Sequence, residues 1–147
     1  AICTAEIIHA AHRAERITVI FINNAVFGMT GGQMAPTTML GQITATTQQG
    51  RNPSNGQGYP LQVSEILALL PGTVYVERCA LSGVPGIKRT KAAMKHAFGL
   101  QMDDAPGLSL VEILSPCPTY WRMSPAKAMK WIEEEMCKAF PIARLKG

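Results

Sequence analysis

Apolar runs and helical patterns alternate along this chain of 147 residues. Three nearly continuous apolar runs predict strands, which lie at 17–22, 73–79 and 108–114. Apolar residues at helical spacing predict four helices, which lie at 1–16, 61–70, 85–101 and 124–140. Continuous apolar strands are typical of a parallel sheet that is covered on both faces. The alternation therefore predicts a doubly wound α/β domain, a three-layer sandwich with a mostly parallel sheet.

The last predicted helix has the clearest boundary signals. Ser124 is a good capping residue, and Pro125 suits the first helical turn. Lys130, Glu134 and Lys138 follow one another at i, i+4 spacing, which predicts two ion pairs on the exposed side. The expected apolar face contains Met129, Ile132, Met136 and Phe140.

The first predicted strand ends in Asn23-Asn24, and a polar, glycine-rich segment follows it as far as residue 60. A long loop in a compact domain is usually functional, and ligands of α/β sheets bind at the carboxyl ends of strands. Amide oxygens suit magnesium or calcium, and glycine-rich backbone amides suit phosphate. The spacing fits neither a Walker loop nor a dinucleotide fingerprint. A metal–diphosphate site and a plain structural loop remain as interpretations.

Composition narrows the class of protein. With 47% hydrophobic and 16% charged residues, the chain suits one globular domain, and no apolar run approaches membrane-spanning length. Lys88, Lys91 and Lys95 share a helical face, which we interpret as a solvated surface and not as a nucleic-acid site. The four widely spaced cysteines form neither a disulfide framework nor a complete zinc site, which favours a reducing, cytoplasmic setting.

The stretch VIFINNAVFGMTGGQMAPTT, residues 19–38, resembles the thiamine-diphosphate loop of 2-oxoacid:ferredoxin oxidoreductases, in the beta subunit that binds the cofactor's diphosphate. The similarity extends over nearly the whole chain and is greater to the 2-ketoisovalerate and 2-oxoglutarate branches than to the pyruvate branch. The family motif is Gly-Asp-Gly followed by Asn-Asn, of which only the second half is present. We therefore expect residues 1–147 to form a thiamine-diphosphate-binding domain that lacks its N-terminal part.

The resemblance implies roles for individual residues. Asn24 would be a side-chain ligand of Mg²⁺, and Val26 would offer its backbone carbonyl to the same ion. Cys117 would help to hold a 4Fe-4S cluster, together with N-terminal cysteines whose motif this chain lacks. The residues that would line the diphosphate and the thiazolium, or close the loop, are Gly28, Met29, Thr30, Gly31, Gly32 and Gln33. No catalytic acid or base is expected here, because the family's activating glutamate comes from a partner subunit.

The activity implied by the resemblance is oxidative decarboxylation of a 2-oxoacid, dependent on thiamine diphosphate and coenzyme A. Electrons would pass through iron–sulfur clusters to ferredoxin, in a complex with alpha and other subunits. Because the acidic metal ligand has no counterpart, the chain alone is expected to bind the cofactor weakly. Two alternatives remain open: a non-catalytic binding or assembly module, and a thiamine-diphosphate decarboxylase or synthase without iron–sulfur partners.

Overall fold

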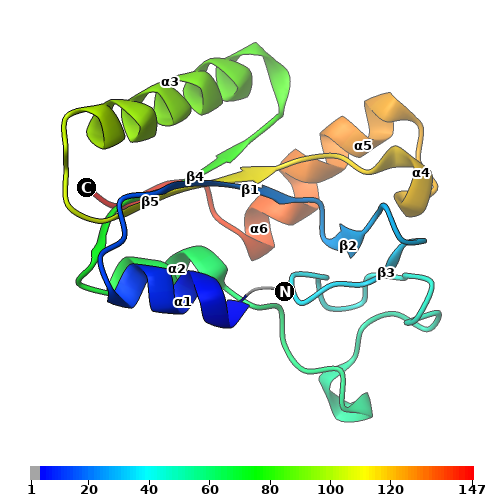
Figure 1. The fold of residues 1–147 in the computed structure, drawn as a ribbon. Coiled ribbons are helices and arrows are strands. Elements are labelled where there is room, and N and C mark those ends of the chain that lie inside the picture. The colour runs from blue at the N-terminus through cyan, green and yellow to red at the C-terminus, as the bar shows by residue number, and fades with distance from the viewer. Residues whose placement is uncertain (1–3) are drawn as a thin grey trace.

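The computed structural model describes residues 4–147 and contains a four-stranded sheet with helices on both of its faces (Figure 1). Its strands are β1 (Thr18–Asn23), β4 (Thr73–Ala80), β5 (Leu108–Leu114) and β6 (Ala143–Lys146). They lie in the order β1-β5-β4-β6, and the first three are parallel to one another. The predicted parallel sheet is thus confirmed. The short strand β6, which pairs antiparallel with β4, was not predicted.

Helices α1 (Thr4–His12) and α2 (Val63–Leu69) cover one face of the sheet, and α3 (Gly83–Met102) covers the other (Figure 1). Leu67 of α2 packs with Val76 and Leu110 on the first face. Ala93 and Ala97 of α3 pack against the opposite face. The predicted three-layer sandwich is therefore confirmed. No helix among residues 4–147 combines the length and the apolar character needed to cross a membrane.

Strand β1 differs from the expectation that every strand is covered on both faces. Among the described residues it has one neighbour, β5, so it forms an edge of the sheet. Its residues are mostly half-buried, and Ile22 is 53% exposed. The continuous apolar run therefore does not correspond here to a fully buried strand.

The C-terminal helical segment is less regular than predicted. It contains α4 (Pro118–Trp121), α5 (Pro125–Trp131), the π-helical turn η2 (Ile132–Met136) and α6 (Cys137–Ala139). The Ser124 side chain accepts a hydrogen bond from the Lys127 amide at 3.4 Å, which confirms the predicted cap. Lys130 pairs with Glu134 as predicted, but Lys138 pairs with Glu135. Because η2 rotates the residues that follow it, spacing derived for a continuous α-helix fails beyond this turn.

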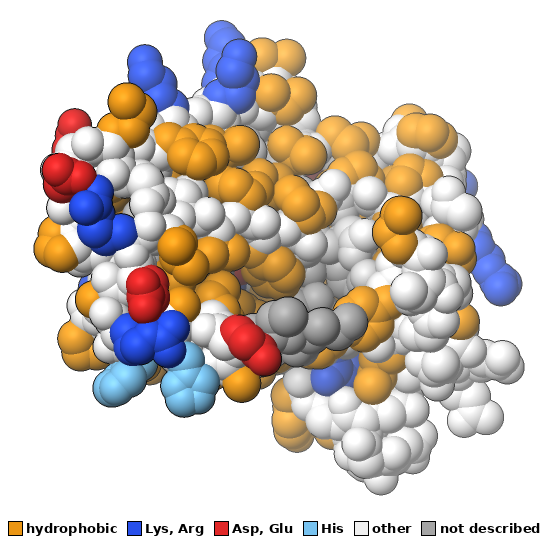
Figure 2. Space-filling view, in the orientation of Figure 1, with side chains coloured by type: hydrophobic (Ala, Val, Ile, Leu, Met, Phe, Trp, Pro, Cys, Tyr) orange, Lys and Arg blue, Asp and Glu red, His pale blue; other side chains and the backbone are white. Residues whose placement is uncertain are grey.

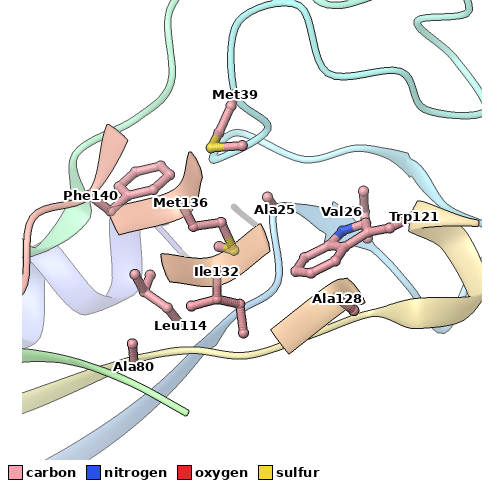
Figure 3. Packing of buried hydrophobic residues seen from close by; sticks show 10 residues of the cluster. All are labelled: Ala25, Val26, Met39, Ala80, Leu114, Trp121, Ala128, Ile132, Met136 and Phe140. Atoms are coloured by element: carbon pink, nitrogen blue, oxygen red, sulfur yellow. The ribbon is translucent and has the colours of Figure 1, made fainter. Parts of the chain in front are cut away.

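The segment after β1 is more ordered than the predicted loop. It forms a hairpin of β2 (Val26–Phe27) and β3 (Gln33–Met34), and later the 3-10 turn η1 (Pro53–Asn55). Ala25 and Met39 of this segment pack with Met136 in a cluster that Figure 3 shows in close-up. The cluster also includes Leu114, at the end of β5. The candidate loop is thus attached to the strand ends by a hydrophobic core.

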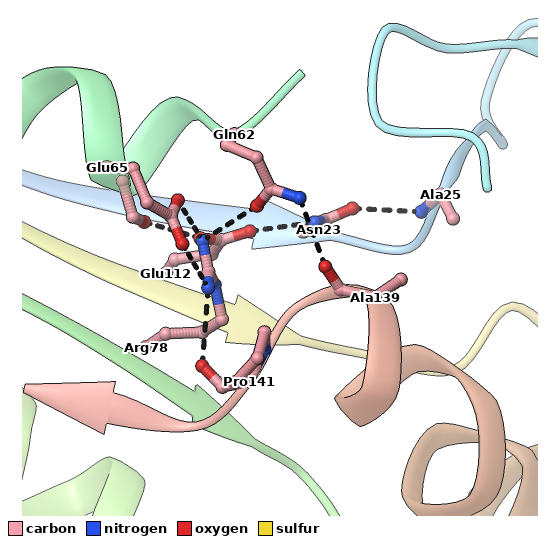
Figure 4. Close-up of polar contacts among 9 residues, drawn as sticks. Asn23, Ala25, Gln62, Glu65, Arg78, Glu112, Ala139 and Pro141 are labelled. Atoms are coloured by element: carbon pink, nitrogen blue, oxygen red, sulfur yellow. Dashed lines mark hydrogen bonds and ion pairs between the residues drawn. The ribbon is translucent and has the colours of Figure 1, made fainter. Parts of the chain in front are cut away.

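A buried polar network crosses the sheet beside this core (Figure 4). Arg78 of β4 is fully buried and contacts Glu112 of β5, with 2.7 Å between Nε and Oε2. Its Nη2 lies 2.6 Å from Oε2 of Glu65. Glu112 also accepts hydrogen bonds from Ser64 and from Asn23. Burial alone would raise the pKa of Glu65, but its bond to Arg78 and the Arg78 charge lower that pKa below its usual value.

Replacing Arg78 by methionine should destabilise the fold strongly. The variant would leave the Glu112 carboxylate buried without its counter-charge, which costs about 3–5 kcal/mol. Urea unfolding followed by circular dichroism measures the difference. The control is Arg13→Met, which removes an exposed ion pair with Glu15 and should change the free energy of unfolding by less than about 1 kcal/mol. Similar losses in both variants would contradict a central role for the buried pair.

Candidate cofactor-binding site

The two neighbouring asparagines have different environments. Asn23 is the last residue of β1 and only 1% exposed. Its Nδ2 donates to Oε1 of Glu112 at 2.7 Å, and its Oδ1 accepts from the Ala25 amide at 3.1 Å. Both ends of its side-chain amide are therefore used within the protein. Asn23 is a structural residue that connects the candidate loop to the buried network.

Asn24 lies just beyond the strand and is half-buried. Its Oδ1 accepts one bond from the Val26 amide, at 3.3 Å. An amide oxygen has two lone pairs, so this atom retains capacity for a ligand. The Asn24 backbone carbonyl accepts a hydrogen bond from Nε1 of Trp121 at 3.1 Å. The indole thus fixes the backbone while the side-chain oxygen keeps one site free for coordination.

Ala25 turns the chain sharply between the two predicted metal ligands, Asn24 and Val26. Its φ angle is +57°, a left-handed conformation that costs a residue with a Cβ atom roughly 1–2 kcal/mol. Two hydrogen bonds hold this turn. The Ala25 amide donates to Asn23, and its carbonyl accepts from Oγ1 of Thr38 at 2.6 Å. The strained backbone is therefore fixed from both sides, as is common at ligand sites.

The glycine-rich stretch forms the tip of the β2–β3 hairpin. Gly31 and Gly32 have φ angles of +121° and +74°, which only glycine adopts readily. Thr30 Oγ1 donates to Oε1 of Gln33 at 2.7 Å, and Nε2 of Gln33 donates to the Thr30 carbonyl at 2.8 Å. These two bonds tie the tip together. Met29 is fully exposed at its end.

A pocket of about 780 Å³ adjoins this hairpin tip. Its walls are the Gly31–Gly32 turn, part of the segment 43–48, and residues 119–122. Arg122 provides a cation at its wall, and Thr44 and Gln48 provide polar groups. Neither Asn24 nor Val26 lines it, so the pocket and the candidate metal ligands are separate features of the same end of the sheet.

Cys117 lies beside the loop, because the parallel strands β1 and β5 end at the same edge of the sheet. It precedes α4, and its thiol is free and half-buried. A Cβ atom added to Gly28 would lie 3.3 Å from the Cys117 sulfur and 3.4 Å from Nδ2 of Asn24. The structure therefore brings together residues that are more than eighty positions apart. Cys3 lies outside the described residues.

The metal-binding capacity of the described chain is small. Residues 4–147 contain no group of three or more His, Cys, Asp or Glu side chains that could hold a metal ion. Asn24 and Val26 can supply two oxygen donors. Magnesium commonly uses few protein ligands and completes its shell with phosphate oxygens and water, so this donor set fits a metal–diphosphate complex.

Two residues that hold the site were not predicted from the sequence. Thr38 supplies the hydroxyl that binds the Ala25 carbonyl, and Arg51 is buried within the loop segment itself. Their partners are mainly backbone carbonyl groups, which leave no side-chain pattern in the sequence. The only signal was an arginine within an otherwise uncharged stretch.

The fold and the strand-end loop together define a diphosphate-binding α/β domain. Residues 1–113 match the family model described as "Thiamine pyrophosphate enzyme, C-terminal TPP binding domain". This match covers more than half of the chain, so the chain belongs to that family.

Curated relatives place the chain more closely. It is 46% identical over 137 residues to ketoisovalerate oxidoreductase subunit VorA of Methanothermobacter thermautotrophicus, covering 93% of this chain and 28% of the relative. It is 35% identical over 128 residues to 2-oxoglutarate synthase subunit KorB of Archaeoglobus fulgidus, covering 86% of this chain and 42% of the relative. The chain therefore spans less than half the length of these relatives.

A solved structure has the same fold. It is the 2-oxoglutarate:ferredoxin oxidoreductase from Magnetococcus marinus, solved with 2-oxoglutarate, coenzyme A and succinyl-CoA bound. The TM-score is 0.64 at 23% identity, and the match covers 82% of this chain and 36% of that chain. The predicted resemblance to this group of proteins and the predicted fold are thus confirmed.

Replacing Gly32 by alanine should disrupt the hairpin tip. The new Cβ atom would lie 2.3 Å from Cδ1 and 2.8 Å from Cγ of Tyr120, in addition to the strain of its positive φ angle. Gly41→Ala is a matched control, because Gly41 has a φ of +73° and no atom within 4 Å of the added carbon. Urea unfolding should show the backbone cost of roughly 1–2 kcal/mol for Gly41→Ala and a larger loss for Gly32→Ala. Equal losses would mean that Tyr120 moves aside freely.

Proposed function

We propose that this chain is the diphosphate-binding part of a 2-oxoacid:ferredoxin oxidoreductase whose substrate is 2-ketoisovalerate. The observation that carries the proposal is the 46% identity to a ketoisovalerate oxidoreductase subunit across 93% of the chain. The identity to a 2-oxoglutarate synthase subunit is lower, at 35%. The enzyme would decarboxylate the 2-oxoacid oxidatively, form a coenzyme A thioester and deliver electrons to ferredoxin.

In this proposal the loop after β1 holds the diphosphate of thiamine diphosphate and its Mg²⁺ ion. Asn24 contributes its side-chain oxygen, and Val26 contributes its backbone carbonyl. The hairpin tip, residues 28–33, would line the diphosphate and the thiazolium, while its Gly31 and Gly32 amides and the Thr30 hydroxyl donate within the hairpin and hold its shape. Thiamine diphosphate supplies a thiazolium that acts as nucleophile and electron sink when bound. The chain's own task is to bind and orient that group, and no acid or base of this chain is assigned to the reaction.

Other components would complete the enzyme. We propose that alpha and further subunits supply the activating glutamate and part of the substrate site, and that ferredoxin accepts the electrons. A 4Fe-4S cluster would use Cys117, whose sulfur lies next to Gly28 of the loop. The free thiols of Cys79, Cys117 and Cys137 support a reducing, cytoplasmic location. The expectation that residues 1–147 form a single thiamine-diphosphate-binding domain stays a prediction.

Calorimetric titration of thiamine diphosphate with Mg²⁺ tests the proposal on the complete oxidoreductase. Asn24→Ala should weaken binding by about 10-fold or more, because a metal ligand is lost. Asn23→Ala should lower the thermal midpoint and weaken binding less than Asn24→Ala does, because its amide binds Glu112 and the Ala25 turn and not the ion. A protein that binds no thiamine diphosphate would refute the function. Equal losses of affinity in both variants would refute the division of roles.

Cys117→Ser should lower the iron content and the rate of ferredoxin reduction while sparing thiamine-diphosphate binding. A serine oxygen is a poor replacement for a thiolate ligand of an iron–sulfur cluster. Iron analysis and visible absorbance of the anaerobically purified complex measure the effect. Cys137→Ser, which changes a half-buried cysteine without an assigned role, is the control. A full complement of cluster in Cys117→Ser would make Cys117 an ordinary packing residue.

A further inference from the structure

Arg51 has an unusual environment. Arg51 is only 5% exposed. Within residues 4–147, its guanidinium donates hydrogen bonds to backbone carbonyl groups alone. Among these hydrogen bonds, Nη2 donates to the Tyr59 carbonyl at 2.7 Å and Nη1 donates to the Pro36 carbonyl at 2.8 Å. The six carbonyl groups belong to Ala35, Pro36, Thr38, Gln57, Gly58 and Tyr59. They come from two separate stretches of the loop.

No carboxylate compensates this charge within the part of the chain that the structure describes. Burial lowers the pKa of the Arg51 guanidinium, but an arginine side chain stays protonated in proteins. The carbonyl dipoles therefore solvate the cation. Because the carbonyl groups belong to residues 35–38 and 57–59, the Arg51 guanidinium also joins these two stretches of the loop to each other. Lysine could not replace it, since an ammonium group has three donors and lacks the planar fork.

A short chain of bonds leads from Arg51 to the candidate metal ligands. Nη1 of Arg51 binds the backbone carbonyl of Thr38. The Thr38 side chain is fully buried, and its Oγ1 donates to the Ala25 carbonyl at 2.6 Å. Ala25 is the left-handed residue between Asn24 and Val26. The position of the Arg51 guanidinium therefore bears on the conformation of this turn.

We propose that Arg51 is a positioning residue for the metal-binding turn, and that it acts through Thr38. The guanidinium fixes the Thr38 backbone, and the Thr38 hydroxyl holds Ala25 in the conformation that directs Asn24 and Val26 to one ion. This inference rests on the proposed function, because the ion is the Mg²⁺ of the thiamine-diphosphate complex. It assigns a role in cofactor binding to a residue that does not contact the cofactor.

The test compares four variants in the complete oxidoreductase: Arg51→Lys, Thr38→Val, Thr38→Ser and Arg144→Lys. Titration with Mg²⁺ and thiamine diphosphate should show losses of about 10-fold or more for Arg51→Lys and Thr38→Val, as for outer-shell partners of metal ligands. Thr38→Ser keeps the hydroxyl and should restore the affinity. Arg144→Lys changes an arginine at the far edge of the sheet, paired with Glu77, and should leave the affinity unchanged.

A second readout separates positioning from general loss of stability. Hydrogen exchange is measured on a peptide that contains the Ala25 and Val26 amides and on a peptide from β5. Both amides donate to asparagine side chains, so a released turn should exchange faster in the first peptide alone. Faster exchange in both peptides would assign Arg51 a purely structural role. Unchanged affinity in Arg51→Lys and Thr38→Val would also overturn the inference.

The failure of the proposed function would look different. In that case the unchanged protein would bind no thiamine diphosphate in the presence of Mg²⁺. The exchange measurement would still judge whether Arg51 and Thr38 fix the turn at Ala25. If Arg51→Lys does not fold, the comparison of Thr38→Val with Thr38→Ser decides the outcome, because valine removes the hydroxyl that binds Ala25, serine keeps it, and both leave the Thr38 carbonyl that accepts from Arg51 in place.

Discussion

The buried carboxylate of Glu112 is the group on which the arrangement of the strand ends depends. It lies on the central strand β5 and binds Arg78 of β4, Asn23 of β1 and Ser64 of α2. A buried carboxylate that lost these partners would cost several kcal/mol. Strand side chains alternate between faces, so a slip of one residue would turn Glu112 to the opposite face and break all three contacts. The network thus favours the observed strand register over registers that are shifted by one residue.

The same network determines where the candidate loop begins. The hydrogen bond to Glu112 fixes the orientation of the Asn23 side chain. The Oδ1 of Asn23 then accepts a hydrogen bond from the Ala25 amide. On the other side of the turn, the Thr38 hydroxyl holds the Ala25 carbonyl. The turn is therefore held by the sheet through its N–H group and by the loop through its C=O group. A strained conformation that is fixed before ligand binding lowers the entropic cost of binding.

The sequence was sufficient for the architecture because apolar periodicity reports burial directly. It predicted β4 and β5 closely, but it missed β6, which is four residues long and half-buried. Arg78 and Glu112 are polar residues within apolar strands, and nothing in a linear pattern tells which two charges meet across a sheet. Arg51 was missed for another reason: it binds backbone carbonyls, which every residue possesses.

Asn23 and Asn24 have identical side chains but differ in burial, and this difference separates their roles. Both residues carry the same amide, and at the level of the sequence only the family resemblance distinguishes Asn24 from Asn23. Asn23 is still part of the sheet, so its side chain points into the polar network and both of its ends are bonded (Figure 4). Asn24 is the first residue after strand β1 and is half-buried. Its side-chain oxygen accepts one long hydrogen bond, from the Val26 amide at 3.3 Å. Of the two asparagines only Asn24 is partly exposed, so it is the one that an ion could reach from solvent, as the proposed role requires. The histidines of α1 lie on the surface at the lower left of Figure 2, away from the β2–β3 hairpin at the right of the same view.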